Sequence, residues 1–158
     1  MKSAIVAALL LPALLAAPAS AEELLDGSKI DDILAIAQKY GPATLEQQQN
    51  GNPRISATTE GVSYQIFFMN CAANAVCEDL NFYAGFKDIK PAMDALNTWN
   101  RDKRFGSAYL DADLDAAIEY DVNLEYGVSR KNLDAAFGVW SLLLGEFAAY
   151  IGYKPQAE

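Results

Sequence analysis

VSYQIFFMNCAANAVCEDLNFYAGF, residues 62–86, holds two runs of alternating apolar and polar side chains on either side of a short loop. The apolar side chains share one face of each run: Val62, Tyr64, Ile66 and Phe68 in the first, and Leu80, Phe82, Ala84 and Phe86 in the second. A period of two over eight or nine residues predicts half-buried strands. The loop is too short for a crossover, so the two strands pair antiparallel. This hairpin predicts a sheet with one apolar face that other elements must cover.

Working outward from the hairpin, the same reasoning predicts three helices and four further strands. Ser28 and Asp31 indicate the start of a helix, and Ser129 indicates a cap for the longest one. Residues 22–27 are expected to be a frayed start. The expected helices are 29–40, 91–103 and 130–150, and the remaining strands are 43–48, 54–59, 107–111 and 114–123. In the last strand Asp115, Glu119 and Asp121 are expected on the solvent face.

The resulting order is α-β-β-β-β-α-β-β-α. Short turns between successive strands predict an antiparallel sheet of five to six strands, packed by the three helices. The fold class is therefore α+β.

The chain begins with a pattern typical of a secretory signal peptide. A positive Lys2 precedes an apolar run from Ala4 to Ala16, and Ala19 and Ala21 occupy the small-residue positions of a cleavage site. The run is shorter than the roughly 20 residues that span a bilayer. We expect residues 1–21 to be removed, leaving a single domain, 22–158, in the periplasm or outside the cell, without a stable membrane anchor. An uncleaved anchor is the alternative.

The two cysteines, Cys71 and Cys77, lie in the loop of the hairpin. In an exported protein an even cysteine count favours a disulfide. The facing ends of paired strands would bring the two residues close enough to bond. A redox-active pair is the rival interpretation, but such pairs use C-x-x-C at a helix N-terminus.

Composition excludes several classes of function. The chain of 158 residues has no histidine, which removes Ser-His and Cys-His catalysis and histidine-ligated metals. A net charge of −9 disfavours binding to nucleic acid. Asp111, Asp113 and Asp115 resemble the start of a calcium loop, but Ala116 and Val122 stand where that loop needs Gly and Glu. We therefore expect an acidic turn, and neither a metal nor a cofactor.

Two stretches carry a resemblance to a known family: LNTWNRDKRFGSAYLDADLDAAIEYDVNL, residues 96–124, and LLGEF, residues 143–147. Together with the strand that ends at Cys71, they make the chain similar to the YbjN domain family over about 28–152. The resemblance implies a fold similar to type III secretion chaperones and a role as a bacterial sensory transduction or stress regulator. It supplies no catalytic residues. With the exposed edges of a small sheet, it also favours a homodimer.

The compact basic cluster at the end of the central helix is the candidate binding site. Arg101, Lys103 and Arg104 complement the helix C-terminus, and they also suit an acidic partner. The candidate partner-binding residues are Asn100, Arg101 and Arg104.

The leading hypothesis is a non-enzymatic exported protein that binds a protein or peptide by a groove or a sheet edge. The alternative is a small-molecule sensor with a pocket between sheet and helices, lined by Tyr64, Phe82 and Trp140. Glu119 and Asp121 share a strand face, which leaves an enzyme that uses carboxylates alone as a third class.

Overall fold

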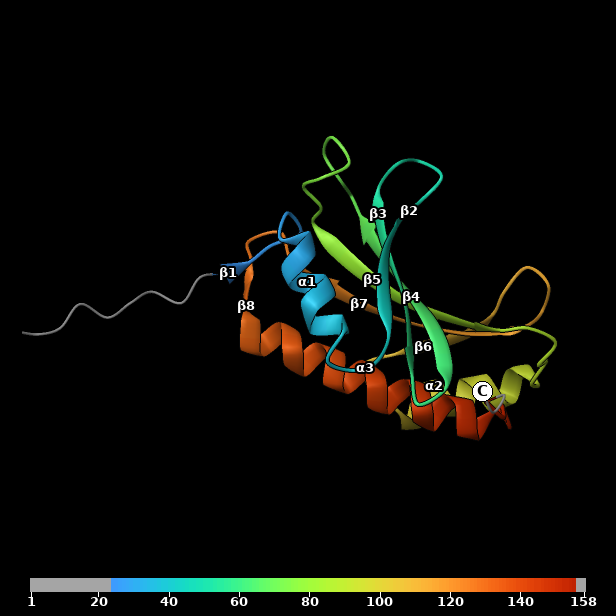
Figure 1. Ribbon diagram of the computed structural model, residues 1–158. Coiled ribbons are helices and arrows are strands. Elements are labelled where there is room, and N and C mark those ends of the chain that lie inside the picture. The colour runs from blue at the N-terminus through green and yellow to red at the C-terminus, as the bar shows by residue number, and fades with distance from the viewer. Residues whose placement is uncertain (1–23, 156–158) are drawn as a thin grey trace, which may run out of the picture.

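The computed structural model describes residues 24–155 and shows an antiparallel six-stranded sheet with helices packed on one face (Figure 1). The strand order is β2-β3-β4-β5-β7-β6, and β1 and β8 form a separate two-stranded sheet. The strands are β1 (Leu24–Leu25), β2 (Ala43–Gln47), β3 (Pro53–Thr59), β4 (Val62–Met69), β5 (Asp79–Phe86), β6 (Ser107–Leu110), β7 (Ala116–Asn123) and β8 (Val128–Ser129). The helices are α1 (Ile30–Ala37), α2 (Met93–Asp102) and α3 (Arg130–Tyr150). The predicted α+β class and element order are confirmed. The predicted signal peptide lies outside the described residues.

Helix α3 covers the buried face of the sheet, with α1 beside its first half and α2 beside its last turns (Figure 1). Burial alternates along β3, β4 and β5, as the period of two predicts. At the centre, the Trp140 ring lies 5.7 Å from the Tyr64 ring and 5.6 Å from the Phe82 ring, measured between centroids. Burial raises the pKa of the Tyr64 hydroxyl to about 12. These three residues fill the core between sheet and helix, where the sensor hypothesis placed a pocket.

The expectation of a frayed start at residues 22–27 is wrong for the described part of that segment. Leu24 and Leu25 pair antiparallel with Ser129 and Val128, and Leu25 is only 2% exposed. An apolar side chain buried to this extent gains about 2 kcal/mol relative to its exposed state. The segment is therefore part of the fold, held against the start of α3.

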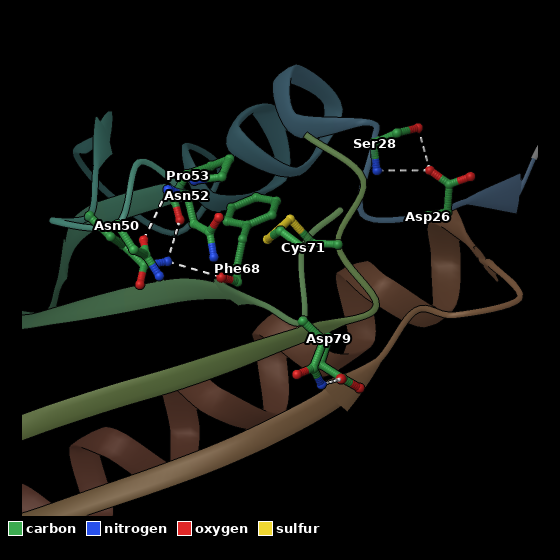
Figure 2. Close-up of a disulfide and its surroundings, with 11 residues drawn as sticks. Asp26, Ser28, Asn50, Asn52, Pro53, Phe68, Cys71 and Asp79 are labelled. Atoms are coloured by element: carbon green, nitrogen blue, oxygen red, sulfur yellow. Dashed lines mark hydrogen bonds between the residues drawn. A yellow bond between two sulfur atoms is a disulfide. The ribbon is translucent and has the colours of Figure 1, made fainter. Parts of the chain in front are cut away.

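The expected cap of the first helix is also wrong. The Ser28 side chain and backbone N–H both donate to the Asp26 carboxylate, and α1 begins at Ile30 without a side-chain cap (Figure 2). The Ser28 hydroxyl donates to a nearby carboxylate instead of accepting a backbone N–H of the helix, which explains why it is not the cap. The predicted cap of the longest helix is confirmed, because Ser129 Oγ accepts the backbone N–H of Asn132 at 3.1 Å.

We expect Ser129→Ala to lower the free energy of unfolding by about 1 kcal/mol, because it leaves one helix N–H without its acceptor. Ser28→Ala is the matched control and is expected to change stability by only a few tenths of a kcal/mol, since its hydroxyl caps no helix. Urea unfolding followed by circular dichroism measures both. Equal losses for the two variants would contradict the assignment of the caps.

The hairpin of β6 and β7 turns differently from the prediction. The strand begins at Ala116 rather than at residue 114, because Asp111 Oδ1 accepts the backbone N–H groups of Asp113 and Asp115, each at 2.9 Å. Asp115 is only 7% exposed, so its expected place on the solvent face is wrong. The backbone N–H of Asp88, together with the Lys90 ammonium, holds the pKa of the Asp115 carboxyl below its usual range.

Candidate functional site

The predicted disulfide is present between Cys71 and Cys77, with an Sγ–Sγ distance of 2.07 Å (Figure 2). Inside the ring it closes, Ala72 and Val76 pair as an isolated antiparallel bridge. Ala73 and Asn74 turn the chain with φ of 51° and 57°. The left-handed conformation is energetically unfavourable for alanine, which has a Cβ. The turn is therefore weak by itself, and the covalent bond supports it.

The disulfide loop is joined to the N-terminal segment. Cys77 is only 3% exposed, and its carbonyl oxygen lies so close to Gly27 that a Cβ added to that glycine would be 2.0 Å away. On the other side, a Cβ on Gly51 would lie 2.9 Å from the Asn74 side chain. The disulfide therefore fixes a loop that packs against both the N-terminal segment and the turn at Gly51, which gives the bond a role in stability.

The predicted partner-binding residues lie together at the end of α2, but each has a contact inside the protein. The Asn100 side chain accepts the backbone N–H of Ala108 at 2.8 Å and donates to its carbonyl at 2.9 Å. Arg101 pairs with the neighbouring Asp102, and the Arg104 guanidinium lies 4.9 Å from the centroid of the Phe105 ring. Asn100 thus occupies the outer backbone groups of β6 and blocks that edge of the sheet. Partner binding by this cluster stays a prediction.

We expect Asn100→Ala to lower the free energy of unfolding by about 1.5 kcal/mol, because two backbone groups of the buried Ala108 lose their partner. Arg101→Ala is the control on the same helix turn. It removes an exposed ion pair and is expected to change stability by less than about 0.5 kcal/mol. Thermal melting of both variants compares them directly. An Asn100→Ala protein as stable as the control would show that water replaces the amide without cost.

The second face of the sheet, opposite the helices, contains a hollow. Its volume is about 690 Å³, and its lining combines polar side chains with a somewhat larger apolar surface. Lining side chains and backbone come from four strands and the β6–β7 loop, including Ser56, Thr58, Ser63, Gln65, Tyr83, Gly85, Asp111 and Asp113. The hollow forms where small residues pair across strands: Thr58 with Ser63, and Gly85 with Ala117. We call this surface the open face.

Two tyrosines and two carboxylates lie near one another on the open face. Tyr83 and Asp111 line one end of the hollow, and Tyr109 and Glu119 lie beside it on β6 and β7. The Tyr109 hydroxyl donates to Glu119 at 2.5 Å, and the Tyr83 hydroxyl lies over Gly85, 2.6 Å from where a Cβ would be. Burial raises the pKa of both phenols, and the Glu119 and Asp111 carboxylates raise both further. Both phenols therefore sit in a negative field.

The negative charge continues along β5 and β7. Asp121 accepts the Asn81 amide at 2.9 Å, and Asp79 accepts the amides of Asn70 and Asn123 at 2.7 and 2.8 Å. The ion pairs that the structure shows among residues 24–155 involve other carboxylates. Neutral donors thus orient Asp79, Glu119 and Asp121 without cancelling their charge.

Sequence reasoning placed Glu119 and Asp121 on one face of a strand, and the structure agrees. It did not find Tyr83, Tyr109 or the hollow. The available signal was the alternation in residues 79–86, which puts Tyr83 on the polar face of β5.

Two further features bear on the kind of site. Within residues 24–155, no group of three or more carboxylate or cysteine side chains is arranged to hold a metal ion. Within the same residues, no helix combines the length and the apolar composition needed to cross a membrane.

Comparison with known proteins identifies the family. The family model described as "Putative bacterial sensory transduction regulator" matches residues 29–152, from the start of α1 to just past the end of α3. No curated protein matches the chain by sequence. The match includes every strand of the six-stranded sheet and the whole hollow. The chain therefore belongs to the YbjN family.

Proposed function

We propose that this chain is an exported, non-enzymatic regulatory protein that binds a polypeptide partner on the open face of its sheet. The family description fits a regulatory role without catalysis. The observation that carries the proposal is the hollow of about 690 Å³ on the face that the helices leave free. Export is supported by the signal-like start of the sequence and by the disulfide, which persists in oxidising compartments.

The character of the hollow favours a polypeptide over an enclosed small molecule. Small-molecule pockets bury most of the ligand surface. Here the hollow opens to solvent on the sheet face, where an extended segment can lie across several strands. The volume still falls within the range of about 300–1,000 Å³ of small-molecule pockets, which makes a sensor the second candidate.

One hydroxyl at the hollow, that of Ser56, lies beside a carboxylate, the pairing that a catalytic serine would need. Ser56 donates to Glu46 at 2.9 Å, which is the geometry of a nucleophile and a base. The hydrogen bond from Arg54, with that from Ser56, lowers the pKa of the Glu46 carboxyl, and Arg54 neutralises it. A carboxylate with a lowered pKa is a weak base at neutral pH, so this pair activates no serine.

Site-specific photo-crosslinking in living cells tests the proposal. A benzophenone amino acid replaces Ser63 on the open face, or Leu142 on the solvent side of α3 as the control. We expect a crosslinked polypeptide from the Ser63 position and none from Leu142. The labelled protein should also be recovered in the periplasm or medium, beginning at Glu22. Equal crosslinking from both positions, or none from Ser63, would contradict partner binding on the open face.

A further inference from the structure

We infer that the open face docks a basic, extended polypeptide segment, with an arginine or lysine side chain seated between Glu119, Asp111, Tyr83 and Tyr109. This inference rests on the proposed polypeptide binding and specifies the chemistry of the partner.

The charge of Glu119 is oriented but not neutralised. Its Oε1 accepts the Tyr109 hydroxyl, which leaves the other lone pairs of the carboxylate free for a ligand. A phenol contributes a dipole and no net charge, so the full negative charge of Glu119 remains on the open face, beside the hollow. An incoming guanidinium or ammonium replaces water there with charge-assisted hydrogen bonds, which are about twice as strong as neutral ones.

Carboxylates from two elements make the electrostatic field at this end of the hollow negative. Glu119 comes from β7 and Asp111 from the β6–β7 loop, and both raise the pKa of Tyr83 and of Tyr109 beyond the effect of burial. Lys87 is the cation that lines the hollow, and Arg54 nearby is paired with Glu46. With a net charge of −9 for the whole chain, the open face repels acidic segments and attracts basic ones.

Aromatic rings add a flat surface beside the carboxylates. The Tyr83 ring lies 6.2 Å from the Phe67 ring in an edge-on arrangement, and Tyr83 is half-buried. A guanidinium stacks on aromatic faces while its N–H groups reach carboxylates, which favours arginine over lysine.

The spacing of the carboxylates specifies the pattern of the partner. Glu119 and Asp121 are two residues apart on β7 and point to the same face, so they are separated by roughly 6.8 Å along the strand. In an extended partner, alternate side chains have the same spacing. The open face therefore fits a segment with basic residues at every second position.

Fluorescence anisotropy with defined peptides tests this inference. The probe is a labelled decapeptide of alternating Arg and Ser, and its control replaces every Arg with citrulline, which keeps the shape and removes the charge. At 150 mM salt we expect the arginine peptide to bind the mature protein at least tenfold more tightly. Glu119→Gln, which keeps an acceptor for Tyr109, should weaken binding about tenfold, the loss of one charge-assisted contact. Glu146→Gln removes the same charge from α3 and should bind like the parent.

Four results would overturn the inference. Equal binding to the parent and Glu119→Gln would mean that the overall charge attracts the peptide. Equal binding of the citrulline peptide would mean that the open face accepts a polypeptide without reading charge. Displacement by spermidine at the concentration of the peptide would indicate a small-amine site. If neither peptide binds, the Ser63 crosslinking experiment distinguishes two cases. If Ser63 crosslinks to a polypeptide, only this inference fails; if it does not, the proposed function fails as well.

Discussion

Gly27→Ala is expected to lower the free energy of unfolding by about 3 kcal/mol, the upper end of the cost of overpacking. A Cβ at this position would lie 2.0 Å from the carbonyl oxygen of Cys77 and 2.7 Å from its carbonyl carbon. Both atoms belong to the backbone of a residue that the disulfide holds in place. Relief therefore requires the N-terminal segment to move, and Leu25 would leave the core with it.

Chemical unfolding followed by tryptophan fluorescence measures this effect. Gly145→Ala is the control, because it adds the same methyl group within α3, where the nearest atom is a carboxylate oxygen of Glu60 at 3.4 Å. Removing a glycine from a helix interior should raise the free energy of unfolding by about 0.5–1 kcal/mol. A Gly27→Ala protein as stable as the parent would show that residues 24–28 do not pack as the structure describes.

The sheet was predictable from the sequence because its pattern is local and repeated. Residues 62–86 alternate over two full strands, so the buried face of β4 and β5 follows from period alone. β1 was not predictable in this way. It has only two residues, and its partner β8 lies about a hundred residues further along the chain. The same limit applies to Asp115, whose partners, Lys90 and the backbone N–H of Asp88, come from the segment that follows β5.

The candidate site was likewise predictable from the sequence only in part. The shared face of Glu119 and Asp121 follows from the period of a strand. The hollow depends on small residues from several strands, and the negative charge beside it depends on Glu119, which Tyr109 on the neighbouring strand holds by a hydrogen bond. Which of these residues become neighbours depends on the register between strands. That register is determined by the complete sheet and cannot be inferred from any one strand.

Replacing both cysteines by alanine is expected to lower the free energy of unfolding by about 2 kcal/mol. The cross-link joins residues six apart, and the loop entropy that it removes from the unfolded chain corresponds to roughly that amount for so short a ring. The turn inside the ring is weak by itself, because Ala73 occupies the left-handed conformation without the freedom of glycine.

Reduction of the parent protein separates the bond from the side chains. Cys77 is buried, so the double substitution also removes some packing, whereas dithiothreitol breaks only the bond. We expect the reduced parent to lose about 2 kcal/mol and the double variant to be insensitive to reductant. A reduced parent as stable as the oxidised one would mean that the ring has no structural role.

The Gly27→Ala substitution and the loss of the disulfide both affect the backbone carbonyl of Cys77, and combining them gives a sharper test. The carbonyl of Cys77 is the group that a methyl on Gly27 would strike, and the disulfide restrains that carbonyl. With the bond broken, the loop can move away and the methyl group is accommodated at lower cost. The loss from Gly27→Ala should therefore be smaller in the double cysteine variant than in the parent, by at least about 0.5 kcal/mol, as for residues in contact. Strictly additive losses would show that the N-terminal segment and the disulfide loop unfold independently, contrary to the junction seen between them.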